Sequence, residues 1–226
     1  MKRRTLCIMV LGLLATSPLM AQQSVKAIDR PSQPNFVFDD DGGAVQVVPA
    51  DLAPAAPKKF HGGAVLKSVQ QVSVFLGSGW GGENVRARQV ALTDVLATAR
   101  SSELQTHHIK LLPAAPKQED FSRVTAAQLN DLAIQHKLAE MLRDKALAAP
   151  TAGTVFIVFL APEVGSVIGP HQGGTDYAAY HNFFHIEAGE IRYVVVPFDA
   201  SQANHLAAAT RGLIEAALNP HGDGWY

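Results

Sequence analysis

Cysteine is almost absent from this sequence: Cys7 is the only one among 226 residues. No disulfide can form within the chain, so any metal site would have to use histidine, aspartate and glutamate rather than a set of thiolates. Charged residues make up only 17% of the chain and hydrophobic residues 47%. This composition and length favour one globular domain whose core is large enough to hold the fold without cross-links.

A long hydrophobic run is also missing. The apolar stretch at residues 6–15 follows Lys2-Arg3-Arg4 and precedes Ser17-Pro18-Leu19-Met20-Ala21. About ten apolar residues are too few for a membrane span, which needs roughly twenty. A basic start, a short apolar stretch and a small residue at Ala21 are typical of an export signal. We therefore expect a signal peptide at residues 1–21, of the Sec or twin-arginine type, and a periplasmic or extracellular product with no membrane span.

The sequence has no excess of basic residues. Removing the three basic residues of the expected signal peptide leaves 16 lysines and arginines against 20 aspartates and glutamates, a net charge of −4. Nucleic acid is therefore excluded as an expected partner, because its recognition depends on a positive surface.

Periodic hydrophobicity is scarce between residues 22 and 59. Prolines occur at positions 31, 34, 49, 54 and 57, and an acidic patch covers residues 39–41. We expect a flexible, Pro-rich segment over 22–59, since such a composition buries little apolar surface. The folded domain should then cover residues 60–226.

From residue 60 onward, strand and helix patterns alternate. The run TVFIVFLAP at 154–162 is continuously apolar, as in strands buried on both faces, and Thr125 with Gln128 resembles a helix capping box. This order indicates an α/β fold, a single layered domain with a mostly buried sheet flanked by helices. The strands are expected at 69–77, 108–112, 154–162 and 190–198, and the helices at 82–102, 125–149 and 201–218.

Two short motifs could carry chemistry. GSGWGG at 77–82 lies between a strand and a helix, but it lacks the lysine of a phosphate-binding loop, the dinucleotide spacing and the glycine that a hydrolase elbow needs before Ser78. It is interpreted as a turn. His181 and His185 are four positions apart, which places both on one side of a helix or of a strand. They could share a zinc ion or be hydrogen-bonded parts of the core.

The order of the motifs resembles the EXORDIUM-like, phosphate-induced protein family and its bacterial secreted relatives. HGGAVLKSVQQVSVFLGSGW at 61–80 is followed by TVFIVFLAP, YHNFF, IRYVVVP and finally LIEAALNP with GWY. The resemblance implies a zincin-like C-terminal helix carrying His-Glu-x-x-Glu, in which the His and the last Glu hold zinc and the first Glu activates water. At those positions this chain has Arg211, Gly212 and Glu215.

Because arginine repels a metal and glycine cannot take a proton, the sequence favours a protein without catalytic residues or cofactor. We expect an exported binding or cell-envelope interaction protein derived from a metalloprotease-like scaffold, with Arg211, Glu215 and His181 as candidate ligand-binding residues. Its partner would be a cell-envelope or secreted protein. The alternative is a zinc-dependent hydrolase or peptidase whose rearranged metal site uses His181, His185 and Glu215, with His205 and His221 as further possible ligands.

Overall fold

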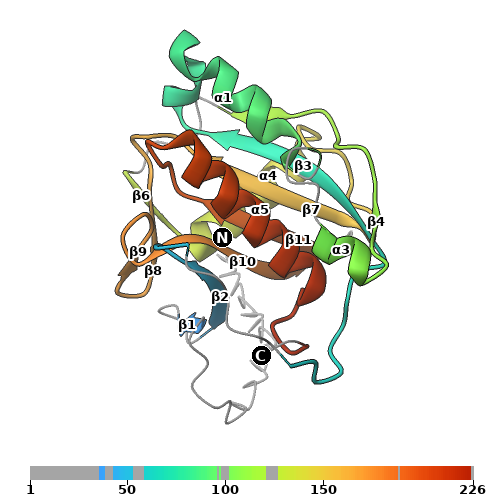
Figure 1. Ribbon diagram of the computed structural model, residues 1–226. Coiled ribbons are helices and arrows are strands. Elements are labelled where there is room, and N and C mark those ends of the chain that lie inside the picture. The colour runs from blue at the N-terminus through green and yellow to red at the C-terminus, as the bar shows by residue number, and fades with distance from the viewer. Residues whose placement is uncertain are drawn as a thin grey trace, which may run out of the picture. The chain divides into compact units, whose positions relative to one another are not determined.

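Eight strands form the main sheet of the computed structural model (Figure 1). The structure describes residues 36–38, 43–52, 59–95, 97, 102–120, 127–187 and 189–224, all within one unit of the chain, residues 32–226. The strand order is β1 (Phe36–Phe38), β2 (Ala44–Pro49), β10 (Tyr177–Ile186), β11 (Gly189–Val196), β7 (Thr154–Leu160), β3 (Ser68–Leu76) and β4 (Lys110–Leu111), and β5 (Gln118–Asp120) also pairs with β3. A smaller sheet contains β6 (Gln128–Asn130), β8 (Gly165–Ile168) and β9 (His171–Gln172).

The centre of the main sheet is parallel. Strand β7 lies between β3 and β11 and runs parallel to both, and all seven of its residues are buried. A strand with neighbours on both edges and helices over both faces has no solvent side, which explains its unbroken apolar sequence. On the other side of β11 the sheet becomes antiparallel, through β10 and then β2.

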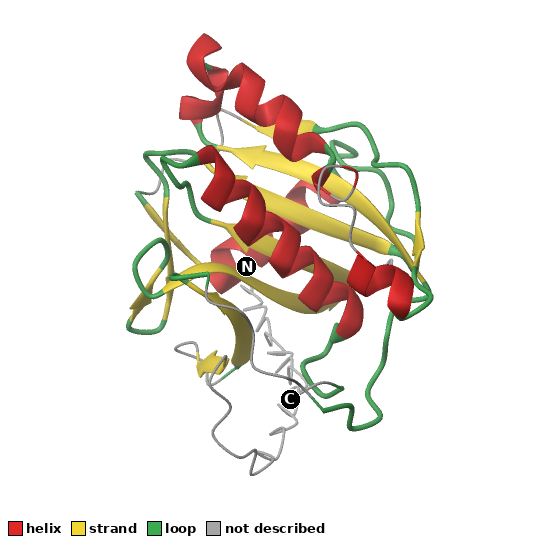
Figure 2. Ribbon diagram, viewed as in Figure 1, coloured by secondary structure: helices red, strands yellow, loops and turns green. Residues whose placement is uncertain are grey.

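Helices cover both faces of this sheet. Figure 2 shows α5 (Gln202–Leu218) crossing the near face and α4 (Asp131–Arg143) behind the strands. The remaining helices are η1 (Ser78–Gly81), α1 (Glu83–Thr93) and α3 (Ser102–Thr106). The predicted α/β fold, a buried sheet between helices, is confirmed at this level. Across the described residues, every helix is too short or too polar to span a bilayer.

Most of the expected elements are present. The strands predicted at 69–77, 154–162 and 190–198 correspond to β3, β7 and β11, and the helix at 201–218 corresponds to α5. The strand predicted at 108–112 is only the two-residue β4. The expected signal peptide, residues 1–21, lies outside the described residues.

The capping box predicted at Thr125 and Gln128 is wrong. Thr125 is not described, and Gln128 belongs to strand β6. The helix begins at Asp131, and the side chain of Asn130 accepts a hydrogen bond from the Ala133 amide at 2.9 Å. Asparagine is as good an N-cap as threonine, so local chemistry allowed both starts. Pairing of Gln128 with Gly165 in the small sheet places the start at the later residue.

The flexible segment predicted over residues 22–59 is wrong for residues 44–49. This stretch is strand β2, which pairs with β10, and Val45 and Val48 are at most 1% exposed. The strand cannot be recognised from its local composition, because it pairs with a strand more than 120 residues later in the chain. The main sheet therefore includes residues before position 60, where the domain was expected to begin.

Candidate functional site

A buried polar network lies between α5 and the antiparallel part of the sheet. Its centre is Gln46 of β2, whose Nε2 donates to Glu215 Oε2 at 3.1 Å. The Gln46 oxygen accepts from Asn219 Nδ2 at 2.9 Å and lies 3.0 Å from His181 Nε2. Because an amide oxygen only accepts, His181 donates from Nε2. Gln46, His181 and Asn219 are all less than 5% exposed, so these bonds fix the C-terminal end of α5 against the sheet.

This network joins two of the three residues that the sequence proposed for ligand binding. His181 and Glu215 are both hydrogen-bonded to Gln46, which lies between them. Arg211 is one turn before Glu215 on α5, is partly exposed, and takes part in interactions of its own. Gln46 was missed from the sequence because it lies in the segment expected to be flexible.

Gly212 faces the sheet rather than a cleft. A Cβ atom at this position would lie 2.5 Å from Val194 Cγ1 and 3.5 Å from Ala179 Cβ. Any side chain larger than hydrogen would therefore overlap with the sheet as α5 is packed here. The resemblance implied a water-activating glutamate at this position, and in this packing a glutamate would point into the core. Glycine at 212 allows α5 to approach β10 and β11 closely.

The close approach at Gly212 predicts the effect of the simplest substitution. Gly212→Ala should destabilise the protein by up to about 2 kcal/mol, because overpacking costs about 1–3 kcal/mol and only roughly 1 kcal/mol of this is offset by the helix propensity that alanine adds. Urea denaturation of Gly212→Ala, Val194→Ala and the double variant measures this effect. The double variant should be more stable than the sum of the single losses predicts, since removing the Val194 methyl groups makes room. Additive losses would contradict the contact.

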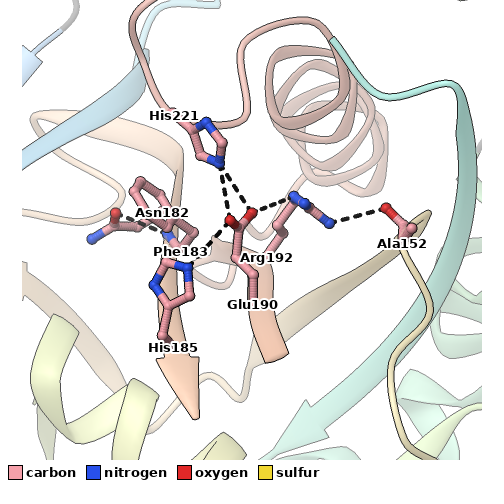
Figure 3. Close-up of polar contacts among 7 residues, drawn as sticks. All are labelled: Ala152, Asn182, Phe183, His185, Glu190, Arg192 and His221. Carbon is pink, nitrogen blue, oxygen red and sulfur yellow. Dashed lines mark hydrogen bonds and ion pairs between the residues drawn. The ribbon is translucent and has the colours of Figure 1, made fainter. Parts of the chain in front are cut away.

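A second polar group lies at the outer end of the β10–β11 hairpin (Figure 3). Glu190 is paired with His185 across the two strands. Its carboxylate is 2.7 Å from Arg192 Nε and 3.5 Å from His185 Nε2, and both of its oxygens are 3.1 Å from His221 Nε2. Arg192 also donates from Nη1 to the Ala152 carbonyl at 3.0 Å.

Aromatic contacts complete this group, which we call the Glu190 cluster: Phe183, His185, Glu190, Arg192 and His221. The Phe183 ring lies 4.7 Å from the ring of His221 and 5.8 Å from that of His185. Exposure falls from 66% for the His185 side chain to 30% for His221, 19% for Glu190 and 15% for Arg192. The cluster thus has a fixed, half-buried base and one imidazole that reaches solvent.

The residues of the alternative zinc site do not come together. His181 and Glu215 both belong to the Gln46 network, whereas His185 lies beside Glu190 in the second group. Within the described ranges, no three histidine, cysteine, aspartate or glutamate side chains are arranged to hold a metal ion. In the Glu190 cluster, His221 lies above and His185 below the carboxylate in the view of Figure 3.

The two ends of the region that carries the family resemblance are in contact. The His61 amide donates to the Gly224 carbonyl at 2.7 Å, and a Cβ on Gly63 would lie 2.3 Å from Gly224 Cα. Asn219 joins this contact to the buried network, because its Oδ1 accepts from the Gly224 amide at 2.7 Å. The His-Gly-Gly motif therefore packs on the C-terminal loop that carries His221.

The glycine-rich turn at 77–82 binds a carboxylate of the same chain, that of Glu163. Glu163, which follows β7, accepts hydrogen bonds from the Gly79 amide at 2.7 Å and from Ser78 Oγ at 3.0 Å. Burial alone would raise the pKa of Glu163, but these bonds outweigh it and lower the pKa below its usual value. Gly77, with φ of 106°, adopts a backbone conformation that favours glycine. The interpretation as a turn fits these contacts.

Sequence reasoning missed most of the Glu190 cluster. Glu190 and Arg192 were not considered, and His221 appeared only among the possible zinc ligands. A hairpin pairing between residues 181–186 and 189–194 would have placed Glu190 opposite His185 and Arg192 opposite Phe183. The position of His221 depends on the loop after α5, which no local pattern gives. Comparisons with protein-family models, with curated proteins and with solved structures found no match for this chain.

Proposed function

We propose that this chain is an exported, noncatalytic binding protein of the cell envelope or extracellular space, built on a metalloprotease-like scaffold, and that the Glu190 cluster is its recognition surface. The observation that supports the proposal is the structural role of Gly212 and Glu215 on the C-terminal helix α5. Gly212 is packed against Val194, and Glu215 is hydrogen-bonded to Gln46. The positions at which the family resemblance implies zinc chemistry thus serve packing and hydrogen bonding.

The charges of the Glu190 cluster indicate the kind of ligand. Two imidazoles and one guanidinium surround a single carboxylate. Groups that can carry a positive charge therefore outnumber the negative ones by three to one. His185 is the most exposed of these groups, and the Phe183 ring lies next to it and next to the His221 ring. We propose that the cluster binds carboxylate groups on a secreted or envelope protein.

Titration of the mature protein with a glutamate-rich peptide at pH 6 tests this proposal. Replacing His185 and His221 together by alanine should weaken binding by at least about tenfold, or 1.4 kcal/mol. Glu190→Gln should strengthen binding, because it removes the negative charge that competes with the peptide. His136→Ala, an exposed histidine on α4, is the matched control and should leave binding unchanged.

Two results would overturn the proposal. Equal weakening by His136→Ala and by the double variant would show that binding depends on net charge alone rather than on the cluster. Stoichiometric zinc in the purified protein, together with zinc-dependent peptide hydrolysis, would favour the alternative of a metal-dependent hydrolase.

A further inference from the structure

His205 is a buried histidine whose ring nitrogens make no hydrogen bond. It lies in the first turn of α5, is 0% exposed, and neither Nδ1 nor Nε2 has a hydrogen-bond partner in the described part of the chain. Three aromatic rings enclose it: Trp80 at 6.0 Å, nearly parallel at 21°, Phe159 at 5.6 Å and Phe198 at 5.7 Å. We call this group of four the His205 box.

A histidine in such a place is costly for the fold. Burying a polar group without a partner costs about 1–3 kcal/mol, and phenylalanine would fill the same space without that cost. The neighbouring Trp80 shows the usual solution, since its Nε1 donates to the Phe159 carbonyl at 3.0 Å. Packing alone therefore does not explain a histidine at position 205, and its remaining distinctive property is that it can take up a proton.

The charged groups around the box oppose that proton. The Arg88 guanidinium of α1 lies 4.7 Å from the centre of the Phe198 ring and donates to the carbonyls of Asp199 and Ala200 at 2.6 and 2.7 Å. The Asp199 carboxylate, which would favour the proton, accepts from the Ser201 amide at 2.6 Å. Burial and, after it, Arg88 lower the pKa of His205 to about 4, and Asp199 offsets this only in part.

Contact with Trp80 does not make up for the lost hydration. A cation over an aromatic face gains about 0.5–2 kcal/mol, whereas the effective penalty for burying an ion is several kcal/mol. Protonated His205 is therefore more stable in water than in the box. The segment that leads into α5 is held to α1 by two hydrogen bonds from Arg88, of which one is part-buried and the other exposed.

We propose that the His205 box is an acid-operated latch: protonation of His205 releases residues 198–205 from Trp80 and Phe159 while the main sheet stays folded. The release would uncover the Trp80 and Phe198 rings at the end of the sheet where β3 and β7 lead into their loops. The device is separate from the Glu190 cluster and from the function proposed for it. It would make this surface available only in acidic surroundings.

Hydrogen exchange followed by mass spectrometry tests the latch on the mature protein. In the open state His205 would have its ordinary pKa of 6.5, so at pH 5 opening should increase about 30-fold relative to pH 7.5. After correction for intrinsic exchange rates, peptides covering 198–205 should show this increase, and β7 should not. In a Trp225→Phe background, Trp80 is the only tryptophan, and its emission should shift to longer wavelength over the same pH range.

His205→Phe is the control, because it keeps the aromatic packing and cannot take up a proton. In this variant the pH-dependent exchange and the emission shift should both disappear. If the variant does not fold, the hydrogen-exchange measurement on the unmutated protein is sufficient to test the proposal. Protection of 198–205 that is lost only together with that of β7 would overturn the proposal, as would an unchanged shift in a folded His205→Phe protein.

Discussion

Replacing Asp131 by alanine is expected to lower the free energy of unfolding by about 3 kcal/mol or more, because each of the three donors that lose their acceptor costs about 1–3 kcal/mol. Asp131 is 2% exposed at the start of α4. Its carboxylate accepts from Tyr193 Oη at 2.6 Å, Gln135 Nε2 at 2.8 Å and Asn182 Nδ2 at 2.9 Å. Alanine would leave these three donors without this acceptor and would remove a negative charge from the helix N-terminus.

Urea denaturation of three variants measures this effect. Tyr193→Phe removes one donor and keeps the carboxylate, so it should cost about 1–2 kcal/mol. Asp131→Asn keeps the shape and one acceptor oxygen and should fall between the other two. A loss below 1 kcal/mol for Asp131→Ala would mean that water replaces the carboxylate and that the network is not what holds α4 on the sheet.

Acidification from pH 7.5 to pH 4 is expected to remove about 3 kcal/mol of stability through His205 alone, at 1.36 kcal/mol for each unit of its pKa shift. Its pKa is lowered from 6.5 to about 4 by burial, then by Arg88. Between these values the unfolded chain binds the proton and the folded protein does not, so stability falls as pH falls. This contribution is complete above pH 6.5, is lost progressively below it, and levels off below about pH 4.

The comparison with His205→Phe isolates this contribution. Other groups titrate equally in both proteins, so the difference between their free energies of unfolding should change by about 3 kcal/mol over this pH range. Urea denaturation at several pH values between 4 and 7.5 gives this difference. A difference that stays constant with pH would show that His205 titrates alike in the folded and unfolded states.

The elements predicted correctly are those whose burial is reflected in the pattern of apolar residues within the element itself. Strand β7 has apolar side chains at every position from Val155 to Leu160 because both of its faces are covered. Helix α5 repeats its apolar residues at helical spacing and is capped by Ser201, whose side chain accepts from the Asn204 amide at 3.3 Å. In both elements the local pattern and the tertiary environment agree.

The elements missed are those whose environment is supplied by distant residues. Strand β2 is short, lies among prolines, and gains its stability by pairing with β10. The start of α4 depends on the pairing of β6 with β8, which placed Asn130 rather than Thr125 at the cap. Local sequence cannot distinguish these outcomes, because strand pairing joins residues far apart along the chain.

By itself, the sequence determined that this protein is an α/β fold with a mostly buried sheet, because side-chain periodicity reflects which faces are covered. At the two positions where the family resemblance implies a metal-activating pair, it has Arg211 and Gly212. Only the tertiary structure decided what replaces that pair. The close contact of Gly212 with Val194, the Gln46 bridge between His181 and Glu215, and the Glu190 cluster all join residues from separate elements. Such contacts depend on how strands and helices pack, which no local pattern specifies.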